Sequence, residues 1–393
     1  MIPLYDGHSR DAQSTRPVEG HAGLWFERFF NQYSQNWSVE DTGKRDFLHS
    51  LLGHHGNEQR RSEGSSCVGY APALQRQTER LASLAESLGG VTFARQSSWH
   101  FATGLGSPHP VENGLSWHPV LGTPYLPGSA VKGLARAWLE LNDYPAEIRK
   151  QLFGSDDKDP LSAQSFAGEP ELVAGRVIFF DALPLEPVSL TLDTMTPHMG
   201  KWYEQGAAQP GRAETVPADW HAPIPVPFLV ARSIVLQFAV APRSKADEPL
   251  VEVAKQALEA ALANLGAGAR TAAGYGAFVE LDEEQQRTQD KRRQERAREE
   301  AERAEQSALA SLSESRRLLL ELQQQAELPA NQQAGSGADF HRQIGEALKA
   351  AKEWPKEDRL ALANFARGFF KTYGSKNRQK EMKPLINELL VDE

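Results

Sequence analysis

The stretch LPGSAVKG, residues 126–133, combines a glycine, a hydroxyl and a lysine, which are the ingredients of a phosphate-binding loop. A nucleotide-hydrolysing Walker loop has four residues between its glycines and a Lys-Ser/Thr pair immediately after the second one. Here Gly122 and Gly128 enclose five residues, and Ser129 comes before Lys132 rather than after it. The spacing therefore excludes a Walker geometry.

The same stretch predicts the start of a helix. Pro127 and Gly128 turn the chain, Ser129 is a suitable N-cap, and we expect exposed amide groups at that end to attract an anion. Lys132 and Arg136, four residues apart, share a helix face away from the apolar stripe. The pair could hold successive backbone phosphates, or it could be the solvated face of an ordinary capped helix. Spacing alone leaves both interpretations open.

Glycines recur in LGAGARTAAGYG, residues 265–276. A dinucleotide-binding loop follows a strand and opens a helix, whereas here a predicted helix precedes and a predicted strand follows. This order argues against a Rossmann site. We interpret the loop as a surface for close approach of an extended polymer backbone, the alternative being a plain flexible connection. The residues expected to contribute are Gly266, Gly268, Arg270, Thr271, Gly274 and Tyr275.

A third candidate site is LDTMTPHMGKWYEQG, residues 192–206. His198 has the chemistry of a general base, but no motif ties a carboxylate to it, and Asp193 and Glu204 are merely near in sequence. A polar and aromatic cluster of this kind could stack on bases or wedge between them. Its members are Thr196, Pro197, His198, Lys201, Trp202 and Tyr203.

Other chemistries are not supported. His100, His118 and His221 lack metal-ligand spacing, and the single cysteine, Cys67, excludes an internal disulfide or a multi-cysteine zinc site. We therefore expect no metal, no cofactor and no catalytic residue. The formal net charge of -9 argues against a wholly basic nucleic-acid binder but is compatible with a local basic groove.

The elements that would position these residues follow a recognisable order. Strands are predicted in 91–104, 175–182, 232–241 and 274–281, and amphipathic helices in 129–143 and 248–266. This order predicts an α+β domain with the split βαβ pattern of ferredoxin-like folds, which many RNA-binding modules share. An insertion at about 183–231 is rich in Pro, Trp and His and shows no obvious long element, so we expect it to be functional.

A chain of 393 residues is long enough for two or more folding units. No window approaches the roughly 18 apolar residues of a membrane span and the first residues lack a signal-peptide pattern, so we expect a cytoplasmic protein. Composition changes sharply near Leu281, where charge, glutamine and alanine take over. We predict an N-terminal helical segment at 1–90, the α+β domain at 91–281, a charged helical spacer at 282–308 and a small helical bundle at 309–393.

Several of these motifs together resemble a known family. The run TGLGSPHPVENGLSWHPVLGTPYLPGSAVKGLAR, residues 103–136, resembles the first conserved block of the RAMP proteins of CRISPR effector complexes. GAGARTAAGYGAF, residues 266–278, resembles their glycine-rich loop. Within that superfamily, DTMTPH followed by KWY, and PADWHAPIPVPFLVA at 217–231, resemble the sixth subunit of type III-B Cmr complexes. The resemblance covers about 91–281.

The resemblance implies an RRM-related, non-catalytic subunit with a thumb-like insertion. Such a subunit binds guide RNA towards its 3′ end and the guide–target duplex. The implied partners are the guide RNA, the target RNA, the repeated backbone subunit, the first Cmr RAMP subunit and the small helical subunit. The residues placed near RNA are Gly128, Ser129, Lys132 and Arg136 at the helix start, together with the glycine-rich loop and the insertion cluster. The helical extension after Leu281 is not part of the usual subunit.

Two other functions remain as alternatives. Some RAMP proteins are metal-independent endoribonucleases that process guide precursors with a histidine near the first helix, for which His118 or His198 would be the candidate. A nucleotide-dependent switch is the third possibility, and both misfit glycine loops argue against it.

Overall fold

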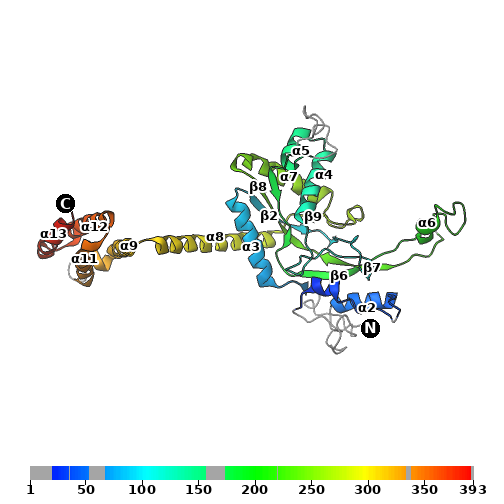
Figure 1. The fold of residues 1–393 in the computed structure, drawn as a ribbon, viewed down its shortest axis with the longest axis horizontal. Helices are drawn as coiled ribbons and strands as arrows, with labels where there is room; N and C mark the ends of the chain where they lie inside the picture. The colour runs from blue at the N-terminus through cyan, green and yellow to red at the C-terminus, as the bar shows by residue number, and fades with distance from the viewer. Residues whose placement is uncertain are drawn as a thin grey trace. The chain divides into compact units, whose positions relative to one another are not determined.

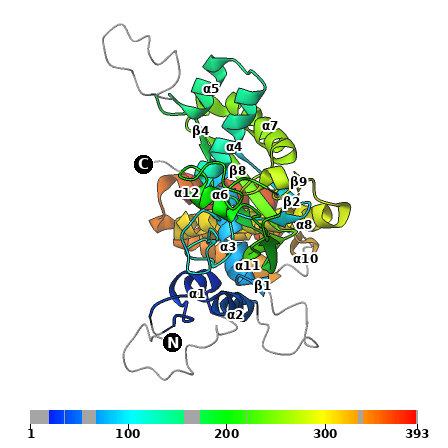
Figure 2. The ribbon, with the colours of Figure 1, turned by 90° about the vertical axis from the view of Figure 1, so that its right-hand side faces the viewer.

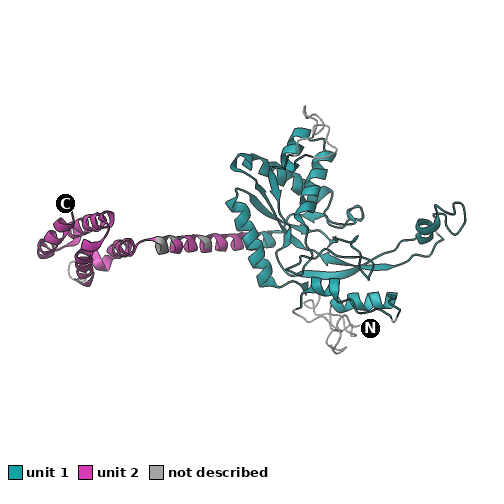
Figure 3. Ribbon diagram, viewed as in Figure 1, with its two compact units in different colours: residues 1–287 teal, residues 288–393 magenta. Residues whose placement is uncertain are grey.

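The computed structural model describes residues 20–34, 36–52, 67–155, 173–218, 220–332 and 338–390. The first 19 residues, on which the expectation of no signal segment partly rests, lie outside these ranges. The chain divides into two compact units, Met1–Arg287 and Thr288–Glu393 (Figure 3). Within the described ranges, no helix is both long and apolar enough to cross a bilayer.

The first unit is built on two antiparallel sheets, as expected for an α+β protein (Figure 1). One sheet has the strand order β4-β8-β2-β9, with β5 paired to β8, and the other has the order β1-β6-β7-β3. The strands are β1 (Cys67–Val68), β2 (Val91–Ser97), β3 (His100–Phe101), β4 (Val177–Phe179), β5 (Leu183–Pro184), β6 (Val188–Met195), β7 (Val226–Arg232), β8 (Val235–Pro242) and β9 (Phe278–Val279).

The helices of the first unit are α1 (Ala22–Arg28), α2 (Asp41–Leu51), α3 (Ala71–Ser87), α4 (Gly128–Leu141), α5 (Ala146–Phe153), α6 (Gly200–Gln205) and α7 (Glu248–Asn264). Among them, α3, α4 and α7 pack on the two faces of the first sheet. α4 and α7 pack side by side on one face (Figure 2). Leu236 and Phe238 enter the main core, whereas Gln237, which points the other way, donates a hydrogen bond to the Thr78 carbonyl of α3 at 2.8 Å. α3 therefore occupies the opposite face of the sheet.

The amphipathic pattern of α4 correctly predicted its buried side. Val131, Ala135 and Leu139 are fully buried in the main core. Leu134 and Trp138, which also recur at helical spacing, are only partly buried and pack at the edge of the core. Because an apolar stripe repeats every three or four residues in a helix, this face can be read from sequence.

Two predictions about strands were wrong. The segment 91–104 is not one strand, because β2 ends at Ser97 and β3 begins at His100 in the second sheet. The insertion at 183–231 does contain long elements: β6 pairs with β7 in a six-residue register from Leu190↔Ala231 to Met195↔Val226. In Figure 1 these two strands run together towards α6, which lies between them in sequence. Strand pairing depends on a distant partner, which local patterns do not report.

The second unit is helical. After α8 (Glu283–Ser311), which begins in the first unit, come α9 (Glu314–Ala326), α10 (Pro329–Gln332), α11 (Ala338–Ala350), α12 (Lys356–Tyr373) and α13 (Lys376–Leu390). The helices α9, α11, α12 and α13 enclose a core that includes Leu319, Ile344, Leu362 and Phe369. Apolar residues recur at helical spacing along each of these segments, which is the pattern that packs helices into a bundle.

Candidate nucleic-acid interface

The start of α4 differs from the sequence prediction in its cap. The helix begins at Gly128 with Pro127 at the N-cap position, and no side chain of the cap residue makes a capping bond, so the assignment of Ser129 as N-cap was wrong. Instead, the Gly128 amide donates a hydrogen bond to Asp181 Oδ1 at 2.6 Å. A Cβ at residue 128 would lie 2.6 Å from the Phe179 carbonyl oxygen, so only glycine allows this approach to β4. One of the backbone amides at the start of α4 is therefore already bonded to a carboxylate of the chain itself.

A cluster of cations follows one turn into α4. The pKa of Lys132 is lowered from its usual value, mainly by burial and to a smaller extent by the positive charges of Arg136 and Arg243 nearby. Arg136 Nε lies 3.3 Å from Glu140 Oε1, and Glu140 is shared with Arg149 at 3.7 Å. Positive groups outnumber the carboxylate on this flank, so a phosphate here would relieve repulsion among them.

The opposite flank of α4 borders a groove of about 500 Å³. Successive residues of an α-helix are rotated by about 100° around its axis. The α4 residues that line this groove, Ala130, Leu134 and Ala137, therefore lie on average about 150° around the axis from Lys132 and Arg136. The groove is lined by residues from the segment after β3, from α4 and from the glycine-rich loop: Thr103, Gly104, Leu105, Gly106, Leu126, Ala130, Leu134, Ala137, Leu265, Gly266, Ala267, Gly268, Ala269 and Thr271. The predicted α4 cations and the glycine-rich loop therefore form two separate surfaces.

The glycine-rich loop is held against β3 by its backbone. The Ala269 amide donates to the Ala102 carbonyl at 2.7 Å, and the Gly276 amide donates to the His100 carbonyl at 2.8 Å. At Gly268, where φ is +90°, a Cβ would collide with the Ala102 carbonyl oxygen. This glycine is required by contact with its own chain. Gly274, also at positive φ, faces open space and leaves room for a ligand.

Three titratable side chains meet beneath this loop, and sequence reasoning did not group them. Tyr275 Oη donates to Asp193 Oδ2 at 2.6 Å, and His100 Nδ1 lies 3.1 Å from the same oxygen. The burial of Asp193 opposes its ionisation, but the hydrogen bonds from Tyr275, the Thr194 amide and His100 outweigh it, and the pKa of the carboxyl is lowered. Burial and the hydrogen bond to Asp193 raise the pKa of Tyr275 to about 12.

No sequence motif signals this Asp193–His100–Tyr275 cluster. The residues lie 82 and 93 positions apart. They come together because β6, β7 and β3 are neighbours in one sheet and the glycine-rich loop lies across them. The only available signal was the alternation of His100 and Asp193 with apolar neighbours in their strands.

The insertion cluster is separate from both surfaces. Trp202 and Tyr203 on α6 are 37% and 76% exposed, so a ligand could reach both rings. Thr196, Pro197 and His198 are exposed as well, and Lys201 lies on the exposed surface of α6. Among the described residues, no hydrogen bond, ion pair or ring contact joins these side chains to α4 or to the glycine-rich loop.

The histidines proposed for acid–base chemistry are poorly placed for it. His118 Nδ1 accepts the amides of Val120 and Leu121 at 3.3 and 3.1 Å, which commits that nitrogen to a turn. Burial lowers the pKa of His118. His198 has no hydrogen-bond partner within the described part of the chain. In the same described ranges, no group of three His, Cys, Asp or Glu residues is arranged to hold a metal ion.

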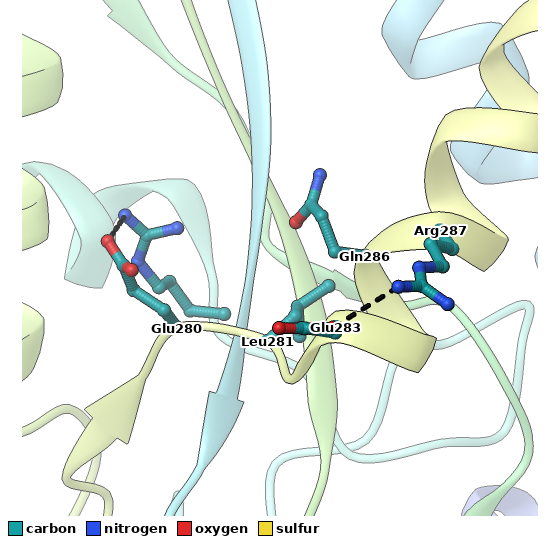
Figure 4. A pocket seen from close by; sticks show the side chains of 6 residues that line it. Glu280, Leu281, Glu283, Gln286 and Arg287 are labelled. Carbon is teal, nitrogen blue, oxygen red and sulfur yellow. Dashed lines mark hydrogen bonds and ion pairs between the residues drawn. The ribbon is translucent and has the colours of Figure 1, made fainter.

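A second cavity, of about 510 Å³, lies where β9 leads into α8 (Figure 4). Its charges pair with one another: Arg95 lies 3.6 Å from Glu280, and Arg287 lies 3.2 Å from Glu283. This internal pairing leaves little net charge to attract a phosphate.

Comparison with known proteins agrees with the resemblance seen in the sequence. The RAMP superfamily model matches residues 92–279. This range includes the central strands of both sheets, the α4 cations and the glycine-rich loop. The CRISPR system Cmr subunit Cmr6 of Pyrococcus furiosus is 31% identical over 242 residues, which are 49% of this chain and 69% of that protein. The chain belongs to the Cmr6 family of the RAMP superfamily.

More distant Cmr6 relatives and structures are also similar. The Cmr6 subunit of Saccharolobus solfataricus is 23% identical over 51% of this chain and 57% of its own length. A chain in a cryo-EM structure of the type III-B Cmr-beta complex bound to cognate target RNA is 18% identical, with a TM-score of 0.44 over 64% of this chain and 76% of that one. The superfamily match ends at Val279, so α8 and the second unit lie beyond it.

Proposed function

We propose that the chain is a non-catalytic, RNA-binding structural subunit of a type III-B CRISPR ribonucleoprotein in RNA-guided antiviral defence. It binds the guide RNA towards its 3′ end and the guide–target duplex. The observation that carries the proposal is membership of the Cmr6 family, whose relatives are named as subunits of CRISPR Cmr systems. The cationic flank of α4 and the glycine-rich loop supply the chemistry for holding a phosphate backbone.

The fold proposed for the RNA-binding part is ferredoxin-like. Its support is the chain order β2–α4–β4–β8–α7–β9 together with the strand order β4-β8-β2-β9. RRM domains stack bases on the open face of such a sheet. Here α3 covers that face, with Gln237 bonded to Thr78. RNA contact is therefore assigned to the ends and edges of the sheet rather than to its face.

The proposed partners besides guide and target RNA are other Cmr subunits: the repeated backbone subunit, the first Cmr RAMP subunit and the small helical subunit. The exposed aromatic rings of the insertion, Trp202, Tyr203 and Trp220, are suited to stacking on bases or docking on a neighbouring subunit. The helical second unit, which lies beyond the superfamily match, is assigned to docking on another subunit.

The competing function is a metal-independent endoribonuclease that processes guide precursors. Such an enzyme needs a base near the attacking hydroxyl, oriented by a second group. His198 has no such partner among the described residues, and one nitrogen of His118 is used by its own turn. These placements favour the non-catalytic role. Incubating the purified chain with repeat RNA in a chelator tests it, and products that disappear with His198→Ala or His118→Ala would establish the nuclease instead.

The main experiment is recovery of the complex from the cells of origin. A tagged full-length chain is purified under mild salt, and its bound RNA and proteins are identified by sequencing and mass spectrometry. We expect a set of guide RNAs and the larger Cmr subunits. Recovery of the folded chain without RNA and without those subunits would refute the proposed function.

A further inference from the structure

Trp99 lies at the corner where two strands pass from one sheet to the other. The chain leaves β2 at Ser97 and enters β3 at His100, while β7 ends at Arg232 and β8 begins at Val235. The Trp99 carbonyl accepts hydrogen bonds from the Ser97 hydroxyl at 2.8 Å and from the Ser233 amide at 3.2 Å. The backbone that carries the indole is therefore fixed before any ligand arrives.

The indole of Trp99 has one supported face and one open face. Its ring stacks on His100 with a centroid distance of 4.3 Å and an interplanar angle of 15°, and it touches Tyr275 at 5.0 Å. His100 and Tyr275 are in turn both bonded to Asp193. Despite these contacts, Trp99 is 49% exposed, so the face opposite His100 is open to solvent. A large aromatic surface is thus presented rigidly to the outside.

Two guanidinium groups accompany this ring. Arg270 is exposed and lies 5.5 Å from the centroids of both Phe228 and Tyr275. Arg232 is exposed and is paired across the ladder with His100, the residue on which Trp99 stacks. Among the described residues, neither arginine has a carboxylate partner. Asp193, the carboxylate within the cluster, is already engaged by Tyr275 and His100.

We propose that Trp99 is a stacking platform for one nucleobase of single-stranded RNA, with the adjacent phosphates next to Arg270 and Arg232. The inference rests on the proposed RNA-binding function and adds a specific subsite to it. Every base has a π-face that can pack on an indole, and unpaired guanidinium groups recognise phosphate oxygens. The Asp193–His100–Tyr275 cluster acts beneath the platform as a positioning group that holds His100 against the inner face of the indole.

The test compares two substitutions that keep an apolar side chain on His100. Trp99→Leu retains packing but removes the π-face, and Trp99→Phe retains a smaller π-face. With a short fluorescent single-stranded RNA and the full chain, we expect Trp99→Leu to weaken binding roughly 5- to 150-fold and Trp99→Phe to weaken it less. Trp37→Leu is the matched control, because Trp37 is 62% exposed and, like Trp99, packs against a neighbouring aromatic ring, here that of Tyr33.

An RNA with abasic sites separates stacking from structural effects. This RNA keeps its phosphates but offers no base to the indole, so we expect the wild type and Trp99→Leu to bind it equally. Equal affinity of Trp99→Leu and Trp99→Phe for normal RNA would overturn the platform. An undiminished loss on abasic RNA would overturn it as well. Failure of the wild type to bind any RNA would instead refute the proposed function, so the two failures are distinguishable.

Discussion

Replacing Lys132 and Arg136 together with alanine removes two cations from the basic flank of α4 and leaves Arg243 in place. Both side chains are partly exposed and flank the buried stripe of Val131, Ala135 and Leu139. Because the Arg136 guanidinium also lies 5.8 Å from the ring centroid of Phe153, the unfolding midpoint of the double variant is measured alongside RNA binding. If these cations hold backbone phosphates, their loss reduces the number of counterions that are released when RNA binds. Binding should become weaker and less sensitive to salt.

The magnitude follows from the number of phosphate contacts. Each contact with a single strand contributes about 0.7 to the slope of log K against log salt, so two contacts contribute about 1.4. Between 50 and 200 mM salt, the wild type should therefore lose about sevenfold more affinity than the double variant. Lys132→Ala alone should account for more than half of the slope change. Arg136→Ala should account for less, because Arg136 is already paired with Glu140.

The assay is fluorescence anisotropy with single-stranded RNA over a series of salt concentrations. The matched control is Arg76→Ala with Arg80→Ala on α3, which removes the same charge at the same i,i+4 spacing from another exposed helix surface. We expect the control to retain the wild-type slope. A wild-type slope in the Lys132/Arg136 variant, or an equal change in both double variants, would refute the assignment of this flank to RNA.

The remaining predictions concern stability. Tyr275→Phe should cost about 1.5–3 kcal/mol in urea denaturation at neutral pH. Because the folded pKa of Asp193 is lowered from 3.8, this penalty is present above pH 3.8 and should fade as the pH drops through the folded value. Gly268→Ala should cost at least about 1–3 kcal/mol, whereas Gly133→Ala in the open interior of α4 should stabilise by about 0.5–1 kcal/mol in the same denaturation assay. Asp358→Asn should lower the free energy of unfolding of the helical unit by about 1–3 kcal/mol, because that carboxylate is buried and accepts three hydrogen bonds. In calorimetry, only the transition of that unit should shift. An unaltered free energy of unfolding in any of these variants would contradict the prediction made for it.

Much of the local structure could be predicted because helical periodicity is encoded within a few turns. The amphipathic helix at 129–143 and the helices of 309–393 were predicted in this way. The N-cap of α4 was not, because the group that serves its first amide is Asp181, from another part of the chain. The β6–β7 pairing was missed for the same reason: its register is fixed by a partner strand 30 or more residues away.

The candidate site shows the same division. The sequence named Lys132, Arg136 and the glycine-rich loop, but it could not tell that α4 separates the two cations from the groove. No role was predicted for His100, and Trp99 was predicted only as part of a strand. Only the fold shows that Trp99 stands at the corner between the sheets with one face on His100.

The sequence by itself determined the family, the main helices and the residue types able to meet a phosphate backbone, since motifs and periodicity are local properties of the chain. The tertiary structure decided which of those residues share a surface. It placed Asp193, His100 and Tyr275 within hydrogen-bond distance across 82 and 93 residues of sequence. That grouping comes from strand pairing and from a loop packed across the sheet, which depend on contacts between distant segments.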